Sequence, residues 1–292
     1  MRVVVCIKQV GYIYDPTAID LSTGEIDSEK MVSMLNPYDE VAVEEAIKIK
    51  ERVIDCEVVI ITAGQPETER ALRYAFAMGG DRMIRINYES SDPWSTALVL
   101  ASAIEKIGYD LVLCGKKAID SNNGQVGSFI AEWLRVPQIS GIVSMNLSAP
   151  EKKAIVERYL GKGDKEELEC GLPALFTAET ALNDPRYPTL PNRLSAQEAE
   201  VEALDTVALG IDSDSEESMT QIMNFSQPRP KTRMVFSPDS SLSASDRLQQ
   251  MMSGGDTNEP SDILEGSTDR LAGHFVEFLI QEKILGDAED DK

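Results

Sequence analysis

The sequence predicts an α/β fold: an open, mainly parallel sheet with helices on both faces, followed by an extended C-terminal arm that ends in a helix. Two observations support this prediction. Up to Pro137, short β-branched runs alternate with helical segments of about 12 to 15 residues, which is typical of a parallel sheet covered on both faces. From residue 205 to about residue 267 the chain is rich in Ser, Asp, Pro and Met, and little of it can build a core. We therefore expect a domain of residues 1–204 and an arm of residues 205–292.

The alternating elements follow one another through the first half of the chain. Residues 3–7 are a β-branched run of the kind found in buried parallel strands, and residues 11–35 then predict a hairpin-like excursion. Asn36 as N-cap and Pro37 at the first helical position predict the start of a helix. Further strands are expected at 57–62, 82–86 and 110–114, and helices at 38–52, 67–78, 93–107 and 127–134.

The alternation of strands and helices ends at Pro137, and beyond it strand-like runs follow one another without helices between them. Strands are expected at 141–147, 154–160, 166–170 and 174–178, so the sheet extends or gains a hairpin. A proline-rich loop is expected over residues 183–192, and a helix over residues 195–204. In the arm we expect a short helix at 244–252 and a final amphipathic helix at 267–285.

Composition and charge restrict the class of protein. With a net charge of −22, the chain is poorly suited to nonspecific binding of nucleic acid or of an anionic membrane, and better suited to basic protein surfaces. No apolar run approaches the roughly 18 to 20 residues of a membrane span, and the first residues carry no targeting leader. The cysteines, Cys6, Cys56, Cys114 and Cys170, are isolated, so they are expected to be free thiols. We expect a cytoplasmic protein.

Polar residues follow the predicted strands at the edge where open parallel sheets bind ligands. These strand ends are Lys8-Gln9, residues 62–64, residues 115–117 and the loop 118–127. The last is a long polar loop that leads directly into a helix, so its backbone N–H groups would suit a phosphate. Asp120, Asn122 and Asn123 could hydrogen-bond ribose hydroxyls or a base. Turn formation and helix capping explain the same residues equally well.

The arrangements of residues that catalyse most reactions are missing from the sequence. The single histidine, His274, belongs to the expected C-terminal helix, where a surface or interface position is typical. The sequence contains no G-x-G-x-x-G motif, no Walker lysine loop and no cysteine or histidine spacing for a metal. We therefore predict neither catalytic residues nor a metal site.

Several blocks of sequence resemble the β subunit of electron-transfer flavoproteins, and they occur in the family's order over residues 2–204. The blocks are VCIKQV at 5–10, NPYDEVAVEEA at 36–46, AMGGDR at 77–82, GKKAID at 115–120, QVG at 125–127, LPA at 172–174 and NDPRYP at 183–188. The resemblance implies an adenine-nucleotide-binding α/β domain that pairs with an α subunit holding most of a redox FAD. It also implies a nucleotide in the β subunit, which is AMP in simple members and a second FAD in electron-bifurcating members.

The resemblance also implies roles for individual residues. The matching nucleotide positions are Cys6, Asn36, Ala63, Asp120, Asn123, Gln125, Val126 and Gly127. Tyr38 matches an aromatic residue near the partner-held isoalloxazine, which Tyr12 or Tyr14 could also flank; core packing at a helix start is the alternative for Tyr38. Residues 178–190 resemble the loop that docks on acyl-CoA dehydrogenases, with Leu182 as its apolar anchor.

Three functions are compatible with these features. The first is an electron carrier that takes electrons from dehydrogenases, acyl-CoA dehydrogenases of fatty acid β-oxidation among them, and passes them to a membrane-associated quinone oxidoreductase, with structural AMP in the β chain. The second is an NADH-oxidising bifurcating flavoprotein with a second FAD, favoured by Val126 but not by Asn122 and Asn123. The third is a non-redox adenine-nucleotide-binding module. We also expect residues 205–292 to pack on the α subunit.

Overall fold

The described part of the chain alternates strands and helices much as the sequence predicts. The computed structural model describes residues 1–14, 20, 27–90, 92–211, 218–220, 223, 242–252 and 266–281. The strands are β1 (Arg2–Cys6), β2 (Gln9–Ile13), β3 (Met31–Leu35), β4 (Glu57–Ala63), β5 (Arg82–Asn87), β6 (Leu111–Gly115), β7 (Gln138–Ser148), β8 (Lys153–Gly161), β9 (Asp164–Gly171), β10 (Ala174–Ala178) and β11 (Glu202–Asp205). The helices are α1 (Pro37–Arg52), α2 (Glu69–Gly79), α3 (Pro93–Ile107), α4 (Val126–Leu134), α5 (Leu190–Glu198), α6 (Ala244–Met252) and α7 (Thr268–Gln281), with 3-10 turns η2 (Ser28–Lys30), η3 (Pro66–Thr68) and η4 (Thr206–Leu209).

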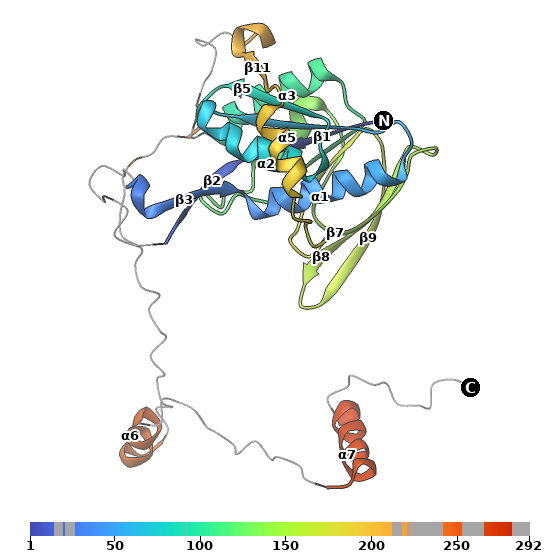
Figure 1. Ribbon diagram of the computed structural model, residues 1–292. Helices are drawn as coiled ribbons and strands as arrows, with labels where there is room; N and C mark the ends of the chain where they lie inside the picture. The colour runs from blue at the N-terminus through green and yellow to red at the C-terminus, as the bar shows by residue number, and fades with distance from the viewer. Residues whose placement is uncertain are drawn as a thin grey trace. The chain divides into compact units, whose positions relative to one another are not determined.

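One large sheet organises the described residues of the first compact unit, Met1–Gln227. Within them the sheet has nine strands in the order β11-β5-β4-β1-β6-β10-β7-β8-β9 (Figure 1). All pairs from β11 to β7 are parallel, and β7, β8 and β9 form an antiparallel meander. The predicted open, mainly parallel sheet is confirmed, and so is its extension by a hairpin beyond Pro137.

Hydrophobic side chains cover both faces of this sheet. On one face α1 and α2 pack through residues such as Val43 and Leu72. On the other face α3 and α4 pack through residues such as Leu100 and Ile130. Because the central strands are buried on both sides, they are continuous apolar runs without alternation, which is why their positions can be recognised in the sequence.

The order of the strands creates a crevice between β1 and β6. From β1 the chain moves through α1 to β4 and through α2 to β5, and α3 then crosses back to β6 on the other side of β1. The connections after β1 and β6 therefore diverge to opposite sides of the sheet. In α/β sheets this switch point, at the carboxyl ends of the strands, is where ligands bind.

A helix is present where one was expected over residues 195–204, but the expected bounds are wrong. Helix α5 begins earlier, at Leu190, because the Thr189 hydroxyl accepts a hydrogen bond from the Asn192 N–H (3.4 Å) and a proline lies in the first turn. The helix ends at Glu198, and β11 then pairs in parallel with β5. Pairing with a sheet edge therefore outweighs local helix propensity in this segment.

Three aromatic side chains join the first turn of α3 to α4. The Trp94 ring lies 5.3 Å from the Phe129 ring at an interplanar angle of 80°, and 5.0 Å from the Trp133 ring. Edge-on and tilted contacts of this kind stabilise beyond the area that they bury. The aromatic contact thus links the two helices that cover the same face of the sheet.

The second compact unit, Pro228–Lys292, contains α6 and α7 among its described residues. The predicted short helix at 244–252 is confirmed, and α7 confirms the amphipathic helix over 268–281, while residues 282–285 lie outside the described part. Phe275 and Phe278 of α7 are exposed. None of the helices that the structure describes is long and apolar enough to cross a bilayer. Packing of residues 205–292 on an α subunit stays a prediction.

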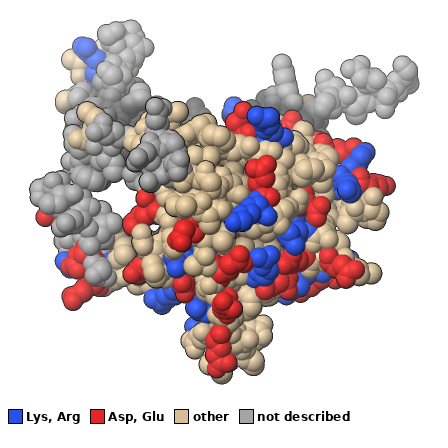
Figure 2. All heavy atoms as spheres, turned by 90° about the horizontal axis from the view of Figure 1, so that it is seen from above, with Lys and Arg blue, Asp and Glu red and all other residues tan. Residues whose placement is uncertain are grey.

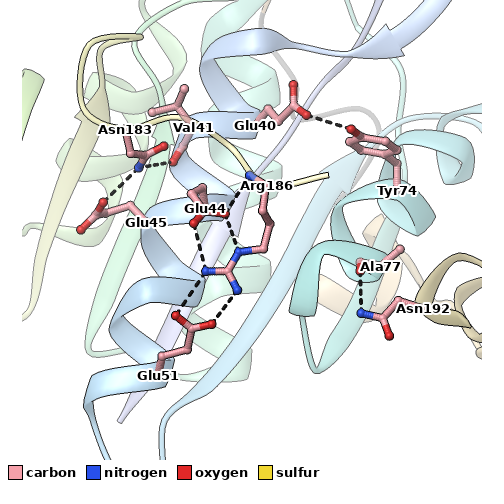
Figure 3. Close-up of polar contacts among 10 residues, drawn as sticks. All are labelled: Glu40, Val41, Glu44, Glu45, Glu51, Tyr74, Ala77, Asn183, Arg186 and Asn192. Atoms are coloured by element: carbon pink, nitrogen blue, oxygen red, sulfur yellow. Dashed lines mark hydrogen bonds and ion pairs between the residues drawn. The ribbon is translucent and has the colours of Figure 1, made fainter. Parts of the chain in front are cut away.

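The segment that contains the NDPRYP block is attached to α1 by polar contacts (Figure 3). The Arg186 guanidinium binds Glu44 (2.8 and 3.0 Å) and Glu51 (2.5 and 3.2 Å), while the Asn183 amide donates to the Val41 carbonyl (3.1 Å). The Glu44 side chain is only 4% exposed. A buried carboxylate of this kind depends on its cationic partner.

We expect Arg186→Ala to lower the free energy of unfolding by about 2 kcal/mol, because the Glu44 carboxylate would lose its ion pair while staying buried. The matched control is Arg158→Ala, whose partner Glu166 is 35% exposed, so we expect a loss of at most about 0.5 kcal/mol. Chemical denaturation of both variants measures the difference. Equal losses would show that the Arg186 network does not stabilise the fold.

Candidate functional site

A cleft opens at the carboxyl ends of the parallel strands, at the β1–β6 switch point. It has a volume of about 650 Å³, within the range of small-molecule sites. Its walls come from the residues after β1, β4, β5 and β6 and from the first turns of α3 and α4. Parallel strands bring these segments together although they are far apart in the sequence.

Asn36 and Asp39, at the start of α1, connect the ends of β1 and β6 below this cleft. The Asp39 carboxylate accepts hydrogen bonds from the Lys8 N–H (2.7 Å) and from the Gly115 N–H (2.9 Å). The Asn36 amide donates to the Lys117 carbonyl (2.9 Å) and accepts from the Ile119 N–H (3.2 Å). Both residues are buried. Asn36 is the predicted N-cap by position, but its side chain bonds to the loop after β6 and does not cap the helix.

Burial sets the protonation properties of the groups at the base of the cleft. It raises the pKa of Asp39 to about 7, although the N–H groups of Lys8 and Gly115 pull in the opposite direction. Cys6 and Cys114 lie side by side in the β1–β6 register, and burial raises the pKa of both thiols well above its ordinary value. A thiol with a raised pKa is a poor nucleophile. These cysteines therefore form an uncharged wall.

The loop 116–125 is held along one side of the cleft. Lys8 forms an ion pair with Asp120 (2.7 Å), and Lys116 forms one with Glu179 (2.6 Å). Burial opposes ionisation of Asp120, but the Lys8 hydrogen bond and charge outweigh it and lower the pKa of this carboxyl group. Asp120 is thus engaged with lysine at the edge of the loop.

The first turn of α4 ends this loop and faces the cleft. Its N-cap, Gln125, forms no side-chain cap, and the first intrahelical bond runs from the Phe129 N–H to the Gln125 carbonyl (3.1 Å). The N–H groups of the first turn are therefore not used within the helix, as an anion site requires. Gly127 is needed there because a Cβ would lie 2.8 Å from Thr177 Cγ2 and 3.1 Å from Cys114 Sγ.

The structure brings most of the predicted site residues together. The cleft is lined by Cys6, Asn36, Ala63, Asn123, Gln125, Val126 and Gly127. Asp120 and Tyr38 lie beside it: Asp120 pairs with Lys8, and the Tyr38 ring lies 5.6 Å from Lys117 Nζ. Leu182 is elsewhere, half-buried and packed against the core, so little of its side chain is available to a partner. Its role as an anchor stays a prediction.

Sequence reasoning missed the wall formed after β5. Ser90, Asp92 and Thr96 line the cleft there. The Asp92 carboxylate accepts bonds from the Ser95 N–H (2.9 Å), which caps α3, and from the Thr220 hydroxyl (2.6 Å). Burial disfavours its charge, but these bonds outweigh burial and lower its pKa. The strand expected at 82–86 ends at the same sheet edge. Since open parallel sheets bind ligands at the carboxyl ends of their strands, the residues after this strand are predictable as part of the site.

One face of the described part of the molecule has mixed charge. Figure 2 shows Lys and Arg interspersed with Asp and Glu across one face, without a large area of one sign. Ion pairs such as Arg82–Glu202 (2.8 Å) account for this mixture. Among the described residues, no group of three or more His, Cys, Asp or Glu side chains is arranged to hold a metal ion.

Several known proteins are similar to this chain in sequence. The family model of the electron transfer flavoprotein domain matches residues 23–209. An electron transfer flavoprotein subunit beta of Bacillus subtilis is 37% identical over 216 residues, 72% of this chain and 82% of the relative. The human subunit beta is 36% identical over 228 residues, 76% of this chain and 88% of the relative. Subunit CarD of the caffeyl-CoA reductase-Etf complex of Acetobacterium woodii is 36% identical over 236 residues, 78% of this chain and 88% of the relative.

We expect Asn36→Asp to lower the free energy of unfolding by about 1–3 kcal/mol, because a carboxylate would face the Lys117 carbonyl in place of a donor. Asn146→Asp, at an exposed position on β7, is the control and should change stability by less than about 0.5 kcal/mol. Chemical denaturation measures both. A wild-type stability for Asn36→Asp would contradict the inferred contacts of the loop.

We expect Gly127→Ala to destabilise the protein by about 1–3 kcal/mol, since the added methyl group would overlap Thr177 behind the cleft. Gly171→Ala is the matched control, because a Cβ at that position meets nothing within 4 Å. Thermal denaturation compares the two variants. Equal melting temperatures would show that α4 does not pack against β6 and β10 as described.

Proposed function

The chain belongs to the β-subunit family of electron transfer flavoproteins, and we propose that it acts in a heterodimer with an FAD-bearing α subunit as an electron carrier. In this proposal the cleft at the β1–β6 switch point holds AMP, and the heterodimer takes electrons from dehydrogenases and passes them to a quinone-linked acceptor. The observation that carries the proposal is the cleft itself, which is lined by most of the predicted nucleotide residues and by a helix N-terminus without a side-chain cap.

The residues of the cleft fit an adenine nucleotide. The N–H groups at the start of α4, from Gln125 to Gly127, would hold the phosphate. Cys6 and Ala63 offer an uncharged wall beside which a base or ribose can lie. Asn36 would act by holding the loop after β6 in place, since both polar atoms of its amide are already bonded to that loop.

The flavin that the partner subunit would hold supplies the electron transfer, and this chain's residues would shield and position it. Tyr38 at the start of α1, and the exposed Tyr12 and Tyr14 (55% and 59% exposed), are the aromatic side chains that we assign to the flavin side of the molecule. None of them needs to transfer a proton in this role. The carrier therefore requires neither a general base nor a nucleophile.

Two segments would contact other proteins. We assign residues 178–190, which the Arg186 network attaches to α1, to docking on acyl-CoA dehydrogenases of fatty acid β-oxidation. Leu182 lies in this segment and is half-buried, whereas the Tyr187 side chain is 90% exposed and so offers a larger apolar surface to a partner. We assign residues 205–292 to packing on the α subunit, supported by the exposed apolar side chains of α7.

An NADH-oxidising bifurcating flavoprotein is the second candidate. Val126, which lines the cleft, is the residue that resembles bifurcating members, and CarD of the caffeyl-CoA reductase-Etf complex is among the similar proteins. In that case the cleft of this chain would hold a second FAD in place of AMP.

Mass spectrometry of the nucleotides released from the native complex tests both functions. The full-length chain is expressed with its α subunit, and we expect one FAD and one AMP for each heterodimer. Two FADs together with rapid NADH oxidation would overturn the carrier in favour of bifurcation. Failure to co-purify with any flavin-bearing partner would overturn both in favour of a non-redox nucleotide-binding module.

A further inference from the structure

The side-chain oxygen of Gln9 is buried without a hydrogen-bond partner. Among the side chains that the structure describes, only this atom and Asn183 Oδ1 have that property. Asn183 lies in the segment attached to α1, where its amide nitrogen already donates to Val41 and Glu45. Gln9 lines the cleft. Buried polar atoms are rarely left unpaired, so one in a binding cleft indicates that a ligand supplies the missing donor.

Gln9 is held in place by its backbone. It is the first residue of β2 and pairs with Leu35 of β3. The adjoining residues are fixed as well, because the Asn36 N–H donates to the Lys8 carbonyl (3.0 Å) and the Lys8 N–H donates to Asp39 (2.7 Å). A side chain on such a rigid turn is presented to the cleft in a defined position, which recognition of a ligand edge requires.

Gln9 lies where the first cleft adjoins a second one. It also lines that second cleft, of about 720 Å³ between β3, α2 and α5, and Glu67 after β4 is the other residue common to both clefts. No residue of the loop 115–127 lines the second cleft. A nucleotide with its phosphate at the start of α4 would therefore direct its base toward β4 and Gln9.

We propose that Gln9 recognises the adenine base of the bound nucleotide. This inference rests on the proposed nucleotide in the cleft. Glutamine is matched to one edge of adenine: its carbonyl oxygen accepts a hydrogen bond from the 6-amino group and its amide nitrogen donates to N7. Hypoxanthine and guanine carry an oxygen at position 6, which would face the Gln9 oxygen without a proton between them. The unpaired oxygen is thus a specificity determinant for adenine over 6-oxopurines.

Nucleotide exchange tests the proposal on the full-length chain in its native complex. AMP, IMP, 7-deaza-AMP and 2′-deoxy-AMP compete with labelled AMP in the wild type, in Gln9→Met and in the control Gln197→Met, which changes a glutamine of the second cleft only. We expect the wild type and the control to prefer AMP to IMP by about tenfold or more. In Gln9→Met we expect AMP to fall to the affinity of IMP, while IMP is unchanged.

The wild type provides a second test that needs no variant. There, 7-deaza-AMP should bind more weakly than AMP, because it lacks the N7 acceptor. Removal of an unpaired buried oxygen should also leave nucleotide-free Gln9→Met at least as resistant to thermal unfolding as the nucleotide-free wild type.

Two results would overturn the role of Gln9 while leaving the nucleotide site intact. One is a wild-type preference for AMP over IMP retained in Gln9→Met. The other is a change confined to 2′-deoxy-AMP, which would assign the oxygen to the ribose. If the wild type binds none of these nucleotides, the proposed nucleotide site itself is wrong.

Discussion

The start of α1 is the constraint on which the site depends. The Asp39 carboxylate accepts hydrogen bonds from the N–H of Lys8, just after β1, and from the N–H of Gly115, at the end of β6. The Asn36 side chain is hydrogen-bonded to the loop that follows β6. Gly115 makes this possible, because a Cβ there would lie 2.3 Å from the Asp39 carboxylate. At a switch point the connections that follow two neighbouring parallel strands diverge, and here the two strand ends are joined by side chains of one helical turn. The cleft therefore has a rigid base before any ligand binds.

The sequence predicted those parts of the fold that depend on local pattern. Buried parallel strands are continuous apolar runs, and α1 and α3 begin at Pro37 and Pro93, so these elements were predictable within a few residues. The segment 195–205 was not predictable in the same way. Its last residues form a strand only because β5 offers an edge more than a hundred residues earlier in the chain.

The candidate site likewise has parts that follow from local sequence pattern and parts that do not. Strand ends could be read from the sequence, and most of them do meet in one cleft. The contacts of Asn36 could not, since its partners lie more than eighty residues away and its capping role was the obvious local explanation. In the sequence Asp92 resembles an ordinary helix cap, but its second oxygen also accepts a hydrogen bond from the Thr220 hydroxyl. Long-range pairing of polar side chains has no periodic signature in a sequence.

The aromatic contact between α3 and α4 has a consequence for observing the cleft. Trp94 and Trp133 are the two tryptophans of the chain, and Trp94 follows Pro93, which lines the cleft. α4 begins at Val126, which also lines the cleft. The indole pair joins the first turn of α3 to the last turn of α4, so a displacement of one helix against the other alters the contact between the two rings. The tryptophan fluorescence of this chain therefore reports the packing of α3 against α4, the two helices whose first turns line the cleft.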